Sequence, residues 1–255
     1  MNPPRADAIF YMSDDKEKNN KNIPTHIAII PDGNRRWAKE KNLPTLEGHR
    51  IGALNFEKLL DAAKEKGVKV MTGWYFSTEN WGRSEEENAY LFDLARKLTQ
   101  QYKKKVYEED IRFRHLGRKD RLPRDIVETL EKLEEDTKDK TSFTVCIGMD
   151  YGGQDELMRT FQKLQEKNLK PSKENIEANL DTADLPMPDM IIRTGGDCRL
   201  SGFMSWQSAY AEFFFAPEYF PDFGPDKIKI AIDNYGNRER RFGGDSKVYG
   251  GGTVE

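Results

Sequence analysis

Short runs of apolar residues alternate along this chain with longer segments in which apolar residues recur every three or four positions. The short runs predict strands over residues 26–31, 68–77, 111–116, 142–149, 189–193 and 211–215. The periodic segments predict helices over residues 34–41, 48–66, 84–108, 124–138, 154–167, 173–179 and 225–236. Several strand segments are apolar at consecutive positions, which is typical of strands buried on both faces. The alternation therefore predicts a single-domain α/β fold, in which helices flank a mostly parallel central sheet of about six strands.

The two ends of the chain differ from this alternating region. Residues 1–22 are polar and carry a charged run from Asp14 to Lys21, which predicts a disordered N-terminal segment. Residues 245–255 continue a glycine-rich stretch and are expected to form a flexible tail. Residues 23–244 contain no internal repeat and no linker, so we expect them to form one folded domain.

Composition and charge exclude several classes of protein. The formal net charge is −3, which argues against a general role in nucleic-acid binding. No segment approaches the roughly 20 apolar residues of a membrane-spanning helix, and no apolar leader indicates secretion. Cys146 and Cys198 are far apart, and the three histidines lack metal-ligand spacing, so neither a disulfide framework nor a zinc site is expected. These features predict a cytoplasmic protein.

The segment HIAIIPDGNRRW at residues 26–37 carries the strongest chemical signal. After an apolar run it brings a carboxylate, Asp32, and a glycine, Gly33, to the start of a predicted helix that opens with Arg35 and Arg36. Helix N-termini present free backbone N–H groups, and arginines bind phosphate oxygens in a bidentate way. Asp32 could hold a divalent metal that bridges to the same phosphate. The segment therefore predicts a phosphate-binding strand end.

Two further predicted strands end in similar polar groups. The second ends in a polar turn followed by a Trp–Arg pair, and these residues are Ser77, Thr78, Glu79, Asn80, Trp81 and Arg83. The fifth ends in an arginine, and a Gly-Gly turn leads to a second cluster, which comprises Arg193, Arg199, Leu200 and Ser201. Parallel sheets bind ligands at the carboxyl ends of their strands. Three such ends on one rim predict a site that holds two diphosphate groups.

Glu212 stands within the apolar sequence QSAYAEFFF, so we expect it to begin a buried strand. A buried carboxylate needs a partner or a metal ion. Magnesium usually takes one or two carboxylates together with substrate phosphates, so Asp32 and Glu212 form a candidate Mg²⁺ site. The alternative is a salt bridge from Glu212 to an arginine of the second cluster.

The other groups also have structural interpretations. Ser84 and Glu87 are typical of a capping box at the start of the long helix. Trp81 has the alternative of a structural residue stacked on its neighbouring arginine. The loop after Arg193 has the alternative of a salt-bridged surface loop. His49 begins another predicted helix and fits either a phosphate contact or a structural role.

The chain resembles the cis-prenyltransferase family, which includes undecaprenyl diphosphate synthase. The segments that carry the resemblance are HIAIIPDGNRRWA (26–38), EGHRIG (47–52), YFSTENWGRS (75–84), YGG (151–153), IIRTGGDCRLSGFMSWQSAYAEFFF (191–215) and NRERRFGG (237–244). They follow the family's order and cover nearly the whole chain. The resemblance implies a catalytic domain over 23–244 with a hydrophobic tunnel, and a homodimer. It also implies condensation of isopentenyl diphosphate with an allylic diphosphate primer, such as farnesyl diphosphate, to a cis-polyprenyl diphosphate.

The resemblance also implies a role for each site residue. Asp32 is the essential carboxylate near Mg²⁺, Glu212 completes the metal site, and Asn80 is a proposed proton acceptor, with the leaving diphosphate as an equal candidate. The residues expected to hold the allylic diphosphate are Gly33, Asn34, Arg35, Arg36, Trp37 and His49. Those expected to hold isopentenyl diphosphate are Arg193, Arg199, Leu200 and Ser201. Those expected to line the reacting centre are Ser77, Thr78, Glu79, Trp81 and Arg83.

Further implications concern the surroundings of the site. The segment 238–244 is expected to reach into the partner's active site, and product release implies peripheral membrane association. No nucleic acid is expected as a partner.

Some positions depart from the family's pattern. Thr45 replaces an arginine that commonly reaches the allylic diphosphate, and either Arg35 or Arg50 is the candidate replacement. Tyr75 replaces an alanine beside the tunnel, and Phe143 begins a strand that is expected to line the tunnel's far end. We therefore expect a narrower tunnel and a product shorter than undecaprenyl diphosphate.

Two other classes of protein stay open on sequence alone. A non-catalytic partner subunit of a heterodimeric cis-prenyltransferase tends to lose the DGN aspartate and the first-strand arginines, which this chain keeps. A nucleotide-binding phosphotransferase is favoured only by the phosphate-like first loop, and the chain has no GxxxxGK[ST] motif.

Overall fold

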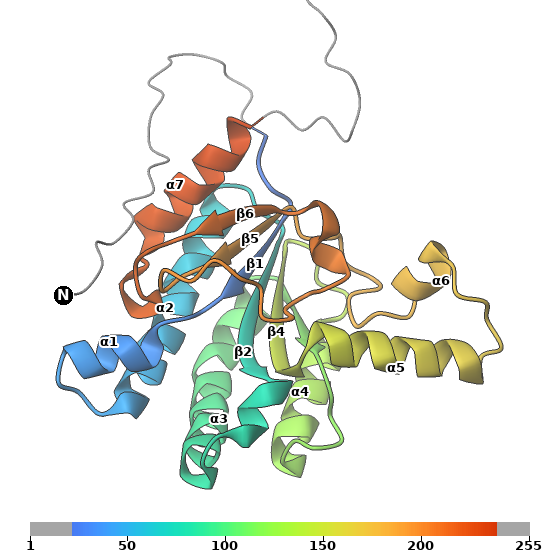
Figure 1. Cartoon of the computed structure of the whole chain (residues 1–255), viewed down its shortest axis with the longest axis horizontal. Coiled ribbons are helices and arrows are strands. Elements are labelled where there is room, and N and C mark those ends of the chain that lie inside the picture. Colours follow the sequence, from blue (N-terminus) through green and yellow to red (C-terminus); the bar gives the residue numbers. More distant parts are fainter. Residues whose placement is uncertain (1–21, 239–255) are drawn as a thin grey trace, which may run out of the picture.

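A computed structural model describes residues 22–238, which form one parallel sheet surrounded by helices (Figure 1). The strands are β1 (His26–Ile30), β2 (Val70–Ser77), β3 (Ile111–Leu116), β4 (Phe143–Tyr151), β5 (Met190–Arg193) and β6 (Glu212–Phe215). Their order across the sheet is β3-β4-β2-β1-β5-β6, and every neighbouring pair is parallel. The predicted fold class and the six strands are confirmed.

Seven helices of the described region match the predicted segments. They are α1 (Asn34–Glu40), α2 (Thr45–Glu65), α3 (Glu85–Glu108), α4 (Arg124–Thr137), α5 (Gly153–Glu166), α6 (Lys173–Glu177) and α7 (Pro225–Gly236). Helix α2 begins three residues earlier than predicted, directly after Pro44, which cannot continue a preceding hydrogen-bonded turn. Three short 3₁₀ turns were not predicted: η1 (Thr78–Gly82), η2 (Gln207–Tyr210) and η3 (Phe220–Asp222).

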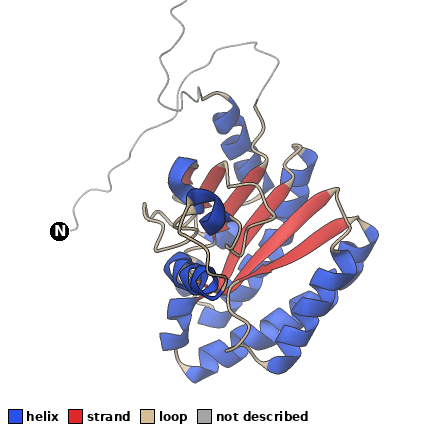
Figure 2. Ribbon diagram, turned by 90° about the vertical axis from the view of Figure 1, so that its right-hand side faces the viewer, coloured by secondary structure: helices blue, strands red, loops and turns tan. Residues whose placement is uncertain are grey.

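The strands divide their side chains between the two faces of the sheet, and helices pack around them (Figure 2). In β1, Ile27 and Ile29 belong to the core that α2, α3, α4 and α7 build on one face. Ala28 and Ile30 belong to a second core on the other face, which includes Phe203 from the connection between β5 and β6. The consecutive apolar residues of β1 are therefore buried on both faces, as predicted.

The predicted disordered segment 1–22 and tail 245–255 lie outside the described residues, except for residue 22, as do residues 239–244 of the C-terminal arginine segment. Within residues 22–238, no helix has both the length and the apolar composition needed to cross a membrane.

Candidate active site

The carboxyl ends of β1, β2 and β5 lie side by side at one rim of the sheet, because β1 pairs with β2 on one side and with β5 on the other. A cavity of about 460 Å³ opens at this rim and extends between the sheet and helices α2, α3 and α4. The predicted site residues that line it are Asp32, Asn34, His49, Ser77, Glu79, Asn80, Arg83, Arg193 and Ser201. Deeper in, the lining is mostly apolar and includes Phe56, Leu60, Leu91, Leu98 and Ile147. The polar strand ends therefore stand at the mouth of an apolar cavity.

Asp32 is held between two arginines at this mouth. Its Oδ1 accepts hydrogen bonds from Arg36 Nη2 at 3.0 Å and from the backbone N–H of Gly33 at 2.6 Å. Its Oδ2 accepts a hydrogen bond from Arg193 Nη2 at 2.8 Å. Because guanidinium groups bind phosphate oxygens as readily as carboxylates, both arginines are placed to exchange this contact for a substrate phosphate.

The backbone of Gly33 lies so close to the side chain of Tyr219 that no other residue type fits there. Its φ is +98°, and a Cβ atom there would lie 2.4 Å from Cδ1 of Tyr219. The Tyr219 ring also lies under the guanidinium of Arg36, 5.4 Å from its Cζ, and its hydroxyl donates a hydrogen bond to Glu40. Sequence reasoning missed Tyr219, because a contact between such distant segments leaves no local signal.

Arg193 connects Asp32 to the loop of the second arginine cluster. Its side chain is buried, and Nη1 donates hydrogen bonds to Ser201 Oγ at 2.9 Å and to the backbone carbonyl of Arg199. Arg199 is 60% exposed and pairs with Asp197 at 2.8 Å. Arg199 is therefore part of a salt-bridged surface loop, as the alternative interpretation expected, whereas Arg193 is not.

Asp197 is a second carboxylate at this rim, to which sequence reasoning gave no role. Its Oδ2 lies 3.3 Å from the same Arg36 Nη2 atom that binds Asp32. Partial burial opposes ionisation, but the hydrogen bond from Arg199 and the nearby charges lower the pKa of Asp197 overall. Asp32 and Asp197 therefore share one guanidinium, that of Arg36.

The η1 turn brings Glu79 and Asn80 to the cavity. The side-chain oxygen of Asn80 accepts the backbone N–H of Ser77 at 3.0 Å, which fixes the turn from within. Trp81 packs against Phe76 and Phe92 and does not line the cavity. The guanidinium carbon of Arg121 lies over the Trp81 ring, 5.8 Å from its centroid, so the structural alternative of a tryptophan stacked on an arginine holds with an arginine from another segment.

Glu87 contacts two arginines and a histidine at the side of the mouth. Ser84 caps α3 as predicted, accepting the Glu87 N–H at 3.2 Å, but the Glu87 carboxylate turns away from the cap. It accepts a hydrogen bond from Arg83 at 2.9 Å and lies 3.5 Å from His49 Nε2 and 3.9 Å from Arg35 Nη1. Burial and the Arg83 charge lower the pKa of His49 to about 4, so His49 is a neutral group at pH 7.

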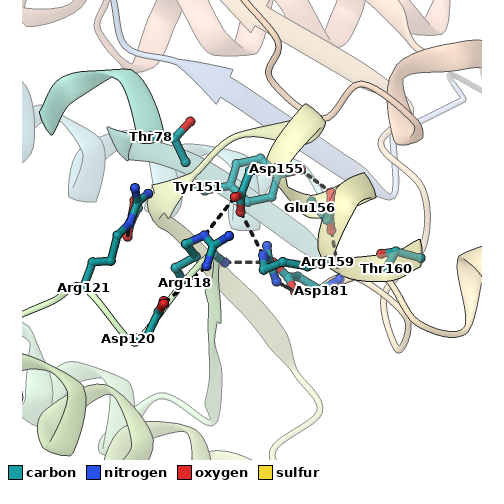
Figure 3. A network of polar contacts seen from close by, with 12 residues as sticks. Thr78, Arg118, Asp120, Arg121, Tyr151, Asp155, Glu156, Arg159, Thr160 and Asp181 are labelled. Carbon is teal, nitrogen blue, oxygen red and sulfur yellow. Dashed lines mark hydrogen bonds and ion pairs between the residues drawn. The ribbon is translucent and has the colours of Figure 1, made fainter. Parts of the chain in front are cut away.

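A network of ion pairs lies next to the η1 turn (Figure 3). Asp155 of α5 accepts hydrogen bonds from Arg118 and Arg159, both at 2.8 Å. Arg159 in turn donates to both oxygens of Asp181, at 2.7 and 2.6 Å. Asp150, which is fully buried, accepts the indole N–H of Trp81 at 2.9 Å and pairs with the guanidinium of Arg121. The network ties α5 and the loop after β3 to the turn that carries Asn80.

Several predicted contact residues lie away from the cavity. Trp37 is buried on the inner face of α1, and Leu200 packs against the core around Phe203, so both act in packing. Thr78 contacts Gly152, where a Cβ atom would lie 2.4 Å from its hydroxyl oxygen. Phe143 itself is buried in the core, and the strand that it begins, β4, lines the cavity through Val145, Ile147 and Met149.

The expectation that Glu212 begins a buried strand is wrong, whereas its place in a metal site with Asp32 stays a prediction. Glu212 begins β6 and pairs in register with Met190, the first residue of β5, whereas Asp32 contacts Arg193 at the other end of β5. These two levels are about 10 Å apart along the strand. The Glu212 side chain is 30% exposed and pairs with Arg238. The apolar residues on either side of Glu212 in sequence suggested burial, but β6 is an edge strand and exposes alternate residues.

An α/β sheet with carboxylates and arginines at the mouth of an apolar cavity is typical of an enzyme whose substrate has an anionic head group and an apolar tail. Comparison with known proteins gives the same class. Residues 30–243 match the family described as putative undecaprenyl diphosphate synthase. The chain belongs to this family.

Similar proteins and structures support the assignment. An isoprenyl transferase from Aquifex aeolicus is 40% identical over 87% of this chain and 96% of its own length, and one from Fusobacterium nucleatum is 41% identical over 89% and 99%. Lavandulyl diphosphate synthase from Lavandula x intermedia, solved with dimethylallyl diphosphate, has a TM-score of 0.82 and 31% identity, covering 87% of this chain and 98% of its own. A probable undecaprenyl diphosphate synthase from Campylobacter jejuni has a TM-score of 0.75 and 32% identity, covering 87% and 99%. The expected class, a prenyl-transferring diphosphate synthase, is confirmed.

Proposed function

We propose that the protein condenses isopentenyl diphosphate with an allylic diphosphate primer, with Mg²⁺, and forms a new cis double bond at each addition. The observation that carries the proposal is the contact of Asp32 with both Arg36 and Arg193 at the mouth of the apolar cavity. An allylic primer is supported by the similar structure that was solved with dimethylallyl diphosphate.

Each of the two arginine clusters binds one of the two diphosphates. The allylic diphosphate binds at the start of α1, where Gly33, Asn34, Arg35 and Arg36 present backbone N–H and guanidinium donors, with His49 beside them. Isopentenyl diphosphate binds to Arg193, Arg199 and Ser201, which are already linked to one another. Because each diphosphate is bound separately, the two reacting carbons are held in a fixed geometry. The reaction then no longer depends on a bimolecular encounter.

The reaction breaks the allylic C1–O bond and joins C1 to C4 of isopentenyl diphosphate. The electron pair of that bond leaves with the diphosphate, so negative charge develops where Arg36 and the α1 N-terminus lie. The apolar lining keeps water from the allylic carbon while it is electron-deficient.

A proton must then leave C2 of the isopentenyl unit. Asn80 lines the cavity, but its side-chain oxygen already accepts the Ser77 N–H, and an amide is a weak base. We therefore assign the proton to the departing diphosphate and give Asn80 the role of fixing the turn.

The residues at the mouth fit a magnesium ion that is bound mainly by substrate. Among residues 22–238, no group of three or more histidine, cysteine, aspartate or glutamate side chains could form a complete metal site. Asp32, with Asp197 close by, offers the one or two carboxylates that Mg²⁺ uses beside phosphate oxygens. When bound, Mg²⁺ would neutralise the charge of the leaving diphosphate.

A homodimer is supported by the outer edge of the sheet. Strand β6 exposes Phe213 and Phe215, whose rings stack 6.0 Å apart, and Tyr210 nearby is 73% exposed. An exposed aromatic edge strand is a typical surface for pairing with a second copy. Glu212 stands on this same strand, so its predicted metal role requires a second copy to bring it to Asp32.

A product shorter than undecaprenyl diphosphate is supported by Tyr75. Its side chain lines the cavity, and its hydroxyl donates a hydrogen bond to the carbonyl oxygen of Leu91 at 2.7 Å. This bond fixes the ring across the space between β2 and α3 and narrows the cavity.

A cytoplasmic location is supported by Cys146 and Cys198, which are both unpaired thiols. Association with a membrane surface during product release follows from the apolar product.

Incubation of the full chain with farnesyl diphosphate, labelled isopentenyl diphosphate and Mg²⁺ tests the proposal. We expect label in a solvent-extractable prenyl diphosphate whose new double bonds are cis by NMR. Failure to incorporate label, together with binding of ATP, would favour the phosphotransferase class instead.

A further inference from the structure

The segment that follows β6 is tied to the ends of both β1 and β5. The backbone N–H of Phe220 donates a hydrogen bond to the carbonyl oxygen of Asp32 at 3.0 Å. The carbonyl oxygen of Glu218 accepts the backbone N–H of Gly195, in the Gly-Gly turn after β5, at 2.6 Å. Tyr219 stands between these two bonded residues, so its backbone is fixed relative to both strand ends.

The side chain of Tyr219 contacts the first turns of α1. Its neighbour Phe220 is 2% exposed and belongs to the core on the α2 side of the sheet, whereas Tyr219 is only partly buried. The Tyr219 ring lies against the backbone of Gly33 and 5.4 Å from Cζ of Arg36. Its hydroxyl donates a hydrogen bond to Oε1 of Glu40 at 2.6 Å, one turn beyond Arg36 on the same helix. The ring is therefore fixed against α1 at two points.

The Arg36 guanidinium is surrounded by groups from several segments. Its Nη2 donates hydrogen bonds to Asp32 at 3.0 Å and to Asp197 at 3.3 Å. A Cβ atom on Gly195 would lie 2.8 Å from this nitrogen, so the Gly-Gly turn also packs closely against it. The Tyr219 ring adds a cation–π contact, in which the negative face of the ring attracts the cation. Because both carboxylates use Nη2, the other two guanidinium nitrogens can still donate to diphosphate oxygens.

Such contacts matter because the Arg36 side chain is 45% exposed. An exposed arginine samples many rotamers and loses this conformational entropy when it binds a ligand. A ring that holds the guanidinium in place before the ligand arrives reduces that loss and so strengthens binding. An aliphatic side chain at position 219 could fill the space beside Gly33, but it has no negative face to attract the guanidinium.

We propose that Tyr219 is a positioning residue for the primer, whose ring keeps the Arg36 guanidinium in the orientation that binds the allylic diphosphate. Tyr219 has this role only if the allylic diphosphate binds at Arg36, so the inference rests on the proposed function. Tyr219 itself does not touch substrate, and its whole effect passes through Arg36. Binding of isopentenyl diphosphate, on the side of Arg193 and Arg199, is independent of Tyr219.

Steady-state kinetics of the full chain with Mg²⁺ test this role. Tyr219→Leu keeps an apolar contact with Gly33 and removes the ring. We expect KM for farnesyl diphosphate to rise by roughly 2- to 30-fold, the range of a cation–π contact. KM for isopentenyl diphosphate should not change. Tyr219→Phe keeps the ring and loses only the bond to Glu40, so it should restore most of the wild-type KM for farnesyl diphosphate.

Tyr107→Leu is the matched control. Tyr107 has the same two kinds of contact at a different place on the molecule: Nζ of Lys103 lies 5.8 Å from its ring centroid, and its hydroxyl donates a hydrogen bond to Asp136 at 2.6 Å. Its replacement should change neither KM. A wild-type KM for farnesyl diphosphate in a folded Tyr219→Leu protein overturns the inference, as does a Tyr219→Phe protein that is no better than Tyr219→Leu. Tyr219→Met takes the place of Tyr219→Leu if the latter does not fold.

A double-mutant cycle shows whether Tyr219 acts through Arg36, and it needs no turnover. Calorimetry gives the affinity for farnesyl diphosphate of the wild type, Tyr219→Leu, Arg36→Ala and the double variant. Tyr219→Leu should weaken binding in the wild type and have little further effect once Arg36 is replaced, because the two residues form one coupled unit. An equal loss in both backgrounds overturns the inference.

The same cycle separates this inference from the proposed function. Coupled binding of farnesyl diphosphate without any chain elongation would reject the proposed reaction and retain the positioning role of Tyr219. Elongation without coupling between Tyr219 and Arg36 would retain the reaction and reject the positioning role. A wild-type protein that does not bind farnesyl diphosphate would reject both.

Discussion

Arg193 Nη2 lies 2.8 Å from Oδ2 of Asp32, although 161 positions separate the two residues in sequence. This ion pair joins the ends of two neighbouring strands, β1 and β5, and connects the two groups that sequence analysis treated as separate diphosphate grips. Since Arg193 also bonds Ser201, one buried guanidinium links the two proposed diphosphate sites.

Asp32→Asn should lower turnover by roughly 10²- to 10³-fold, because the group that orients both arginines and offers a metal ligand loses its charge. Asp32 is partly exposed, so the variant should keep the wild-type melting curve. Incorporation of labelled isopentenyl diphosphate measures turnover. Turnover within a few-fold of the wild type would remove Asp32 from the mechanism.

Arg199→Ala should raise KM for isopentenyl diphosphate by roughly 10- to 100-fold, the loss expected for a charge-assisted hydrogen bond to phosphate. KM for the primer should change little, because the proposed primer site lies on the α1 side. Steady-state kinetics with each substrate varied in turn measure the split. Arg124→Ala, which removes another exposed arginine with a 92% exposed side chain, is the control and should leave both constants unchanged. An equal rise in both constants for Arg199→Ala would contradict the assignment.

Tyr75→Ala should lengthen the product by one or more five-carbon units, because it widens the cavity beside α3. Tyr75→Phe keeps the ring and removes only the hydrogen bond to Leu91, so its products should stay near the wild-type length. Chromatography of the dephosphorylated products gives the lengths. Identical full-length products from the wild type and Tyr75→Ala would refute the narrowing role of Tyr75.

The free energy of unfolding should fall as the pH drops from about 6.5 to 4, partly because of His26. Its ring is fully buried between the carbonyl oxygen of Pro186 and the hydroxyl of Thr72, and burial lowers its pKa to about 4. The native state therefore binds fewer protons than the unfolded state in this range, so acid favours unfolding, by at most roughly 3 kcal/mol for this group. Urea unfolding at several pH values should show a flatter dependence for His26→Gln than for the wild type. Parallel curves would mean that His26 does not titrate in this way.

Phe213→Glu should shift the protein from dimer to monomer, because it places a charge on the exposed aromatic edge of β6. Ile230→Glu, at a comparably exposed apolar position on α7, is the control and should leave the dimer intact. Light scattering gives the mass of each variant. A wild-type protein that is already monomeric would reject the dimer and, with it, the metal role of Glu212.

The order of apolar and polar residues along the chain was enough to predict the helices and strands and the rim of the sheet that carries the polar groups. The run from Ile27 to Ile30 is apolar at every position, which predicts a strand buried on both faces whose following residues emerge at the carboxyl end. This reasoning uses only residues that are neighbours in sequence, and it placed Asp32, Asn80 and Arg193 at one rim of the sheet.

The tertiary structure decided what each side chain faces. Glu212 has apolar neighbours in sequence but stands on an edge strand, so neither its burial nor its distance from Asp32 could be derived from composition. The sharing of Arg36 by Asp32 and Asp197, and the bridge from Lys105 to Glu57, join groups on different elements. Sheet order and helix packing create such contacts, and these depend on long-range packing energies that no local pattern records.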